Sequence, residues 1–210
     1  MRLYYHPLTQ GLRVQLVARE LGIELELVKV DLSKGEQNTP EFLALNPNHH
    51  VPVLQDGDFV LWESYAIMQY LANITPGQTL YPADPKRRAD IDRWLFWCGQ
   101  ELMPAIATLN WENHIKPMAG LGEPDPAQVA DGEARFNMAA SILDALLARE
   151  AWISGDALSL ADFAIAAPLA WHQPGRLPLA QHTHLMAWFR RIEALPTWQE
   201  TLKANAAAMA

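Results

Sequence analysis

Short runs of alternating apolar and polar residues dominate the first 75 residues of the chain. A strand is predicted over residues 3–5, and apolar residues at helical spacing follow over 12–21, where Gly22 ends the pattern. Residues 25–32 alternate again and predict a second strand, which we expect to be buried. Strand, helix and strand in this order imply a parallel pair.

A β-hairpin is predicted after a short helix over residues 40–45. The apolar runs Val51–Leu54 and Phe59–Trp62 flank the dipeptide Asp56-Gly57, and Asp-Gly between apolar runs is a strong hairpin signal. A further helix is predicted over Ser64–Leu71. The hairpin adds antiparallel pairing, so this part of the chain predicts a mixed four-stranded sheet with helices, an α/β domain over residues 1–75.

The remainder of the chain is predicted to be all-helical. Residues 76–85 contain three prolines and a glycine and are interpreted as a linker. Beyond them, apolar residues recur at helical spacing, which predicts a helical-bundle domain over residues 86–210. Ser159 and Asp162 have the spacing of a capping box and predict the start of a helix inside this domain.

Composition excludes several classes of protein. The 24 acidic and 16 basic residues give a net charge of -8, which argues against nucleic acid as a partner. The N-terminus has no apolar stretch typical of a signal peptide, and no apolar run reaches the length of roughly 18 residues that spans a membrane. One cysteine, Cys98, allows no internal disulfide. We therefore expect a cytoplasmic protein without membrane contact.

The first candidate site is Thr9-Gln10, between the first strand and the first helix. A helix N-terminus offers unpaired N–H groups and roughly half a positive charge, so it stabilises a thiolate, and a hydroxyl adds a hydrogen bond. No cysteine lies at this position, so the thiol would have to come from a ligand. The alternative is that Thr9 acts only as a helix cap.

The second and third candidate sites are Val51-Pro52 and Glu63-Ser64. A cis bond before Pro52 would leave the backbone of Val51 free to pair with an extended ligand, whereas a trans proline would only introduce an edge strand. Ser64 at a helix start suits a carboxylate and Glu63 suits an amino group, so together they fit the amino-acid end of a ligand. The alternative for this pair is a simple helix cap.

The remaining candidates are weaker. Adjacent His49 and His50 make a poor chelating pair, so no metal is expected, and a hydrogen bond to a ligand carboxylate is the preferred reading. Cys98 lies in a helical apolar stripe and is interpreted as a core residue. Trp111 and His114, late in the first long helix after the linker, are the candidates for an apolar pocket.

In their order, these motifs resemble the cytosolic glutathione transferase superfamily along essentially the whole chain. Residues 4–9, Tyr-Tyr-His-Pro-Leu-Thr, look like the Tyr-Tyr-x-Pro-x-Ser opening of serine-type classes, which suggests a bacterial serine/threonine-type member (theta, delta or nu-like). Asn46-Pro47 with Val51–Leu54 is similar to the family's cis-proline segment, Glu63-Ser64 to its γ-glutamyl pair, and Ser159–Asp162 to its capping box. Departures are Thr in place of Ser at position 9 and the spacer of residues 48–50.

The resemblance implies a thioredoxin-like N-terminal domain, a helical C-terminal domain and glutathione as co-substrate. Thr9 would be catalytic, with its hydroxyl on the glutathione thiolate, and a small hydrophobic electrophile would bind near Trp111 and His114. The implied glutathione site consists of Thr9, Gln10, His49, His50, Val51, Pro52, Glu63 and Ser64. The family also implies a homodimer.

Four functions remain open at this point. The leading one is a glutathione transferase, in which the activated thiolate attacks an electrophile. A glutathione-dependent disulfide or peroxide reductase, or an isomerase, would use the same thiolate. A non-catalytic protein that keeps the fold for partner binding is the alternative from another class.

Overall fold

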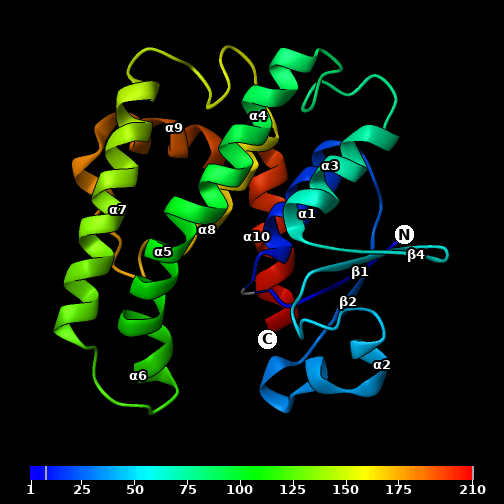
Figure 1. Cartoon of the computed structure of the whole chain (residues 1–210), viewed down its shortest axis with the longest axis horizontal. Helices are drawn as coiled ribbons and strands as arrows, with labels where there is room; N and C mark the ends of the chain where they lie inside the picture. The colour runs from blue at the N-terminus through cyan, green and yellow to red at the C-terminus, as the bar shows by residue number, and fades with distance from the viewer. Residues whose placement is uncertain (8, 210) are drawn as a thin grey trace. The chain divides into compact units, whose positions relative to one another are not determined.

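The computed structural model describes residues 1–7 and 9–209, which form two compact units (Figure 1). Unit 1 comprises Met1–Tyr81 together with Ala194–Ala210, and unit 2 comprises Pro82–Glu193. The last helix of the chain thus belongs to unit 1, although the sequence pattern groups all of residues 86–210 in one helical domain. The domain ranges 1–75, 76–85 and 86–210 stay predictions.

Within the described residues, unit 1 contains one four-stranded mixed sheet, as the sequence predicts. Its strands are β1 (Arg2–Tyr5), β2 (Glu26–Lys29), β3 (Val53–Asp56) and β4 (Phe59–Trp62), in the order β2-β1-β3-β4. β1 pairs parallel with β2 and antiparallel with β3, and β3 pairs antiparallel with β4. Gly57 in the hairpin turn has φ 59°, a conformation that glycine adopts without steric cost.

Helices cover both faces of this sheet. Helices α1 (Gly11–Glu20) and α3 (Ser64–Ile74) lie beside each other on one face, and α2 (Pro40–Leu43) lies on the other, where the buried ring of Phe42 packs against Val30 and Val53 (Figure 1). The 3₁₀ turns η1 (Leu32–Lys34) and η2 (Glu36–Asn38) lead into α2. The thioredoxin-like arrangement predicted for this part of the chain is therefore confirmed.

Helix α10 (Pro196–Met209) completes unit 1 by packing against α1. The Arg19 side chain of α1 donates to Thr201 Oγ1 at 3.2 Å and to Glu200 at 2.8 Å. The Thr201 hydroxyl is buried in this contact. The prediction that the second strand is buried is wrong: β2 lies at the edge of the described sheet, and three of its four side chains are exposed.

Unit 2 is helical. One continuous rod runs through α4 (Pro85–Trp97), the π-helical segment η3 (Cys98–Leu102), α5 (Met103–Asn110), the π-helical segment η4 (Trp111–Ile115) and α6 (Lys116–Met118). It is followed by α7 (Pro126–Leu147), α8 (Leu160–Leu169), the 3₁₀ turn η5 (Leu179–Gln181) and α9 (Thr183–Glu193). Every residue of α8 is buried, so this helix is the centre of the unit's core.

The predicted capping box is present at the start of α8. The fully buried carboxylate of Asp162 accepts hydrogen bonds from Ser159 N and Ser159 Oγ, both at 2.9 Å. Its other oxygen accepts from Ile153 N at 2.9 Å and from Trp188 Nε1 at 3.0 Å. One side chain thus connects the helix start, the preceding loop and α9. No helix in the described part of the chain is long and apolar enough to cross a bilayer.

Candidate functional site

A cavity of about 280 Å³ opens in unit 1 at the start of α3. It is lined by residues from the start of α1, the loop before β3 and the junction of β4 with α3: Gln10, Asn46, Asn48, His50, Val51, Pro52, Glu63 and Ser64. Six of the eight residues predicted for the glutathione site line it, all except Thr9 and His49. The structure therefore brings together three sequence segments that were singled out separately.

The junction of β4 and α3 places the N-terminus of a helix at the cavity. Ser64 is the first residue of α3 and is 6% exposed, and the preceding Glu63 is exposed with φ 75° and ψ 108°. A positive φ is unfavourable for a residue with a side chain, and strained residues of this kind cluster at functional sites. The first N–H groups of a helix have no intrahelical partner, so they and the Ser64 hydroxyl can hold a carboxylate, with the Glu63 carboxylate beside them for a cation.

The loop before β3 is held by Asn46, which is 3% exposed. Its Nδ2 donates to His50 O at 2.7 Å, and its Oδ1 accepts from Asn48 N at 3.0 Å and from Asn48 Nδ2 at 2.9 Å. These bonds fold the loop back on itself and set His50 against the cavity. Asn46 and Asn48 were not predicted as site residues. The one sequence feature that could have indicated Asn46 is the Asn46-Pro47 pair directly after a short helix.

The peptide bond between Val51 and Pro52 is cis. Pro52 is buried, and Val53, the next residue, pairs with Tyr4 of β1. Among the described residues, no hydrogen bond involves the backbone N–H or C=O of Val51. These two groups are therefore available to a ligand with an extended backbone that lies in the cavity.

Thr9 lies just before α1, and its hydroxyl is engaged locally. Oγ1 donates to His6 O at 2.8 Å and accepts from Gly11 N at 3.4 Å, so Thr9 caps the helix start in this arrangement. Burial, together with the nearby charge of Lys29, lowers the pKa of His6. Thr9 is not among the residues that line the cavity, whereas Gln10 beside it is. Leu8, within the motif of residues 4–9, lies outside the described residues.

The two helix starts of this site are joined by Arg13 and Tyr65. The guanidinium of Arg13, in α1, lies 4.5 Å from the ring centroid of Tyr65, the residue after Ser64 in α3. Arg13 is only 1% exposed, and a buried cation over an aromatic face is a favourable contact. This contact links α1 to α3 near their N-termini. Hydrophobic periodicity does not predict it, because it depends on two particular side chains from different helices.

The adjacent histidines have separate surroundings. His50 lines the cavity, whereas His49 has φ 59° and its Nδ1 lies 2.8 Å from Asn38 Oδ1. Among the described residues, no group of three or more His, Cys, Asp or Glu side chains could hold a metal ion.

The remaining candidates belong to unit 2. Trp111 lies in η4 with 44% of its surface exposed, and His114 lies one turn further along the same segment. Neighbouring Asn113 donates to Gly175 O at 2.9 Å, which ties η4 to the loop after α8. Cys98 is fully buried, and its Sγ donates to Ala164 O at 3.5 Å, so its prediction as a core residue is confirmed.

Comparison with known proteins connects this geometry to one family. The N-terminal domain family of glutathione S-transferases matches residues 1–73, and the C-terminal domain family of the same enzymes matches residues 101–196. The chain is 35% identical to glutathione S-transferase 3 of Zea mays over 97% of this chain and 94% of that protein.

Solved structures give the same picture. Glutathione transferase F7 from Populus trichocarpa superposes with a TM-score of 0.87 at 28% identity, over 96% of this chain and 97% of that one. A theta class glutathione S-transferase from Xanthomonas axonopodis pv. citri with glutathione bound superposes with a TM-score of 0.86 at 32% identity, over 96% of each chain. From its fold, its site and these matches, the chain belongs to the glutathione S-transferase family.

Proposed function

We propose that the protein is a glutathione transferase that activates the glutathione thiol for attack on an electrophilic small molecule. The observation that carries the proposal is the cavity at the start of α3, where an unpaired helix N-terminus, an acidic side chain and the free backbone of Val51 meet. An anion site, a cation site and an edge for an extended peptide are the three groups that a γ-glutamyl tripeptide requires.

Each part of glutathione has a counterpart in this arrangement. The Ser64 hydroxyl and the α3 N–H groups bind the γ-glutamyl carboxylate, and Glu63 binds its amino group. The backbone of Val51, held by Pro52, pairs with the cysteinyl unit. His50 and its neighbour His49 bind the glycyl carboxylate, and Gln10 lines the same cavity.

Thr9 is the proposed catalytic residue. Its hydroxyl turns from His6 O to donate to the thiolate sulfur, next to the positive end of α1. The thiol proton leaves to solvent, the sulfur electron pair forms a bond to the electrophilic carbon, and the leaving group departs with its bonding electrons. The electrophile is a small hydrophobic molecule held near Trp111 and His114.

The finer assignments are also proposals. The Thr9 hydroxyl supports a serine/threonine-type member of the theta, delta or nu-like kind, as does the similarity to the Xanthomonas theta class structure. The curated relatives compared with the chain include plant enzymes of 31–35% identity, so identity does not select the bacterial subtype. We place the domain boundary in residues 76–85 and the protein in the cytoplasm.

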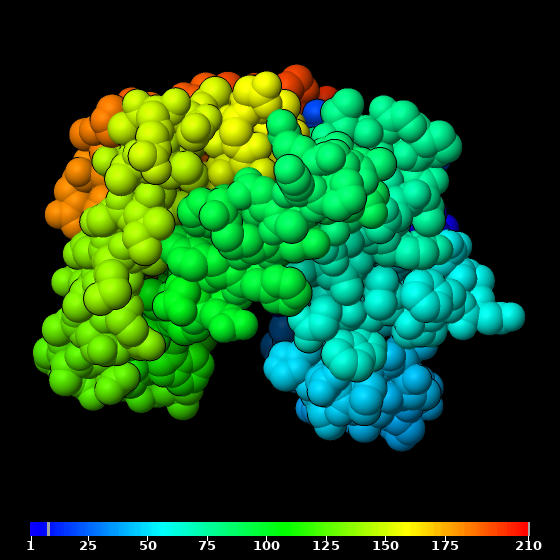
Figure 2. Space-filling view, turned by 45° about the horizontal axis from the view of Figure 1, so that its top comes forward, coloured from blue at the N-terminus to red at the C-terminus, as the bar shows by residue number. Residues whose placement is uncertain are grey.

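A homodimer is proposed because unit 2 carries an apolar face. Phe96, Met138 and Ile142 are 67%, 70% and 49% exposed, and the last two line a cavity of about 280 Å³ between the α4-to-α5 rod and α7. Figure 2 shows this region, with α7 in yellow-green beside the green helices of the rod. Light scattering gives the mass in solution, and the mass of a single chain would contradict the dimer.

A glutathione titration tests the proposed function. We expect calorimetric binding to the wild type and loss of about tenfold or more in affinity in Ser64→Ala and Glu63→Gln, because each loses a charge-assisted hydrogen bond. Glu41→Gln, at an exposed position of α2, is the matched control and should bind as the wild type does. Formation of the conjugate with chlorodinitrobenzene, followed by absorbance, reports the chemistry. Absence of glutathione binding to the folded wild type would refute the proposal.

A further inference from the structure

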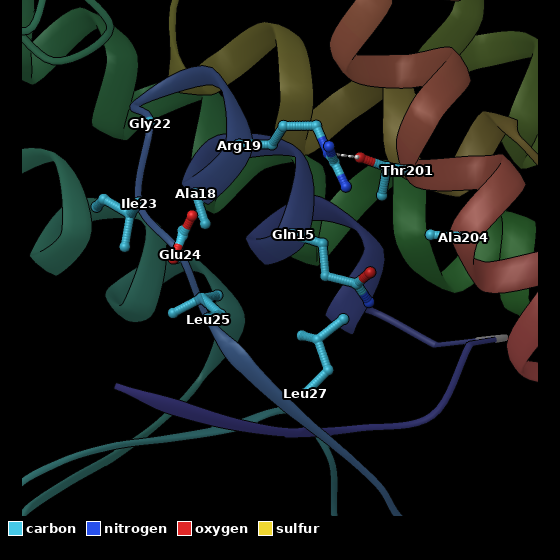
Figure 3. Close-up of a pocket in the computed structure, with 10 residues that line it drawn as sticks. All are labelled: Gln15, Ala18, Arg19, Gly22, Ile23, Glu24, Leu25, Leu27, Thr201 and Ala204. Carbon is cyan, nitrogen blue, oxygen red and sulfur yellow. Dashed lines mark hydrogen bonds between the residues drawn. The ribbon is translucent and has the colours of Figure 1, made fainter.

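Unit 1 contains a second cavity that is larger than the one at the start of α3. It has a volume of about 490 Å³ and opens between the middle of α1, the loop after it, the edge strand β2 and helix α10 (Figure 3). It is lined by Gln15, Ala18, Arg19, Gly22, Ile23, Glu24, Leu25, Leu27, Thr201 and Ala204. None of these residues lines the cavity at the start of α3, so the two sites are separate.

A buried amide without a partner faces this cavity. Gln15 is 6% exposed, and its Nε2 has no hydrogen-bond partner among the described residues. Figure 3 shows its side chain extending from α1, with Leu27 of β2 and Ala204 of α10 on either side of the carboxamide. A buried donor that is left unsatisfied is unfavourable, so this N–H group favours a ligand that offers an acceptor.

Part of the wall around this donor is apolar. Ala18, Ile23, Leu25 and Leu27 line the side of α1 and β2, and Leu27 is 43% exposed although it is a large aliphatic residue. Leu27 belongs to the edge strand β2, and its exposed surface lines the cavity. Surface of this kind gains stability when an apolar group covers it.

The charges at the rim select against an anion. Arg19 is already paired with Glu200 at 2.8 Å and donates to Thr201, and Glu24 adds an exposed carboxylate. The two charged residues in the lining, Arg19 and Glu24, have opposite charges, and the positive charge of Arg19 is already compensated by Glu200 outside the lining. A neutral ligand avoids the repulsion that an anion would meet from the exposed Glu24 carboxylate.

We propose that this cavity binds a neutral, amphiphilic small molecule with an apolar ring system and a carbonyl acceptor. The carbonyl oxygen accepts from Gln15 Nε2, and the ring system covers Leu27, Ile23 and Ala204. The volume is within the range of roughly 300–1,000 Å³ that is typical of small-molecule sites. This site is independent of glutathione and of the proposed transfer reaction.

The test uses prodan, a neutral naphthalene with a propionyl carbonyl, whose fluorescence rises in apolar surroundings. Titrations are made with saturating glutathione present, so that the cavity at the start of α3 is occupied. Ala204→Trp fills the cavity from α10 and should abolish the glutathione-independent binding. Ala206→Trp, at an exposed alanine of the same helix that does not line the cavity, is the matched control and should bind as the wild type does.

Gln15→Met removes the amide and keeps the shape of the side chain, so it should weaken binding by about threefold to tenfold, the effect of one neutral hydrogen bond. Nuclear magnetic resonance adds a direct readout, because the side-chain amide signals of Gln15, assigned by their loss in Gln15→Met, should move when prodan binds. Unchanged affinity in Ala204→Trp, or Gln15 amide signals that do not move at saturation, would overturn the proposal. If Gln15→Met does not fold, the two alanine variants decide it.

Discussion

The carboxylate of Asp162 is the residue on which unit 2 depends most clearly, and Asp162→Asn measures this dependence. Asp162 accepts four hydrogen bonds and is 0% exposed. Asparagine keeps the volume but offers one oxygen and one NH₂ group. If the NH₂ group replaces the oxygen that faces Ser159, the Ser159 hydroxyl can turn and accept from it, but Ser159 N loses its acceptor. In the other orientation, Ile153 N and Trp188 Nε1 both lose theirs.

The expected loss follows from this count. The favoured orientation leaves one buried donor unsatisfied, which costs about 1–3 kcal/mol. The other bonds become weaker because the acceptor is neutral, and this loss is offset because the buried charge disappears. Burial raises the pKa of Asp162, which shows that the charged form carries a desolvation cost. We therefore expect Asp162→Asn to lower the free energy of unfolding by about 1–3 kcal/mol.

Urea unfolding at neutral pH, followed by tryptophan fluorescence, measures this loss. Asp125→Asn is the matched control, because Asp125 is an exposed N-cap of α7 and asparagine caps a helix about as well as aspartate. The control should unfold within a few tenths of a kcal/mol of the wild type. If Asp162→Asn unfolds at the same urea concentration as the control, the central role of this carboxylate is refuted.

Two further predictions concern a helix cap and a titrating group. Asp144 in α7 caps the start of α9, because its carboxylate accepts from His184 N at 2.7 Å and from Leu185 N at 2.9 Å. In urea unfolding, Asp144→Ala should lower the free energy of unfolding by about 1–2 kcal/mol, while Asp144→Asn should retain most of it. Equal stability of the two variants would contradict this capping role. Burial lowers the pKa of His6, so this residue should favour folding above the pKa of about 6.5 of the unfolded chain, and this contribution should be lost as the pH falls through the lower folded value. Magnetic resonance titration of the His6 ring, identified by its loss in His6→Gln, should give a pKa below that of a free histidine, and a value at or above it would refute the reasoning.

Hydrophobic periodicity predicts the order of helices and strands along the chain, but it does not predict which other elements pack against each of them. The helix over residues 12–21 and the hairpin around Gly57 follow from local spacing and turn chemistry, and both are observed. β2 was expected to be buried, yet it is the sheet edge, because alternation in a short strand does not report whether a neighbour pairs with it. The segment after residue 196 has a helical pattern, but its place in the sheet unit becomes visible only in the fold, where Thr201 and Glu200 bind Arg19 of α1.

The candidate site also contains residues that the sequence predicted and residues that only the folded structure reveals. Glu63-Ser64 and Val51-Pro52 follow each other in a recognisable order, so both were found before any geometry was known. Asn46 was missed as a site residue, because its contribution is a set of hydrogen bonds that exist only when the loop folds back. His49 and His50 could not be told apart by residue type, but their surroundings differ. His49 has a positive φ, and it is His50 that lines the cavity.

The claim that Thr9 activates the glutathione thiol is tested most directly by the ionisation of bound glutathione. Thiolate absorbance is measured against pH for the wild type, Thr9→Ser and Thr9→Val, of which the last keeps the branched shape without the hydroxyl. We predict a bound-thiol pKa below the free value of about 8.5 for the wild type and Thr9→Ser, and a rise of about one unit, or roughly 1.4 kcal/mol, in Thr9→Val. Glutathione that binds to Thr9→Val and ionises as it does on the wild type would contradict the account, and Thr9 would then be a helix cap alone.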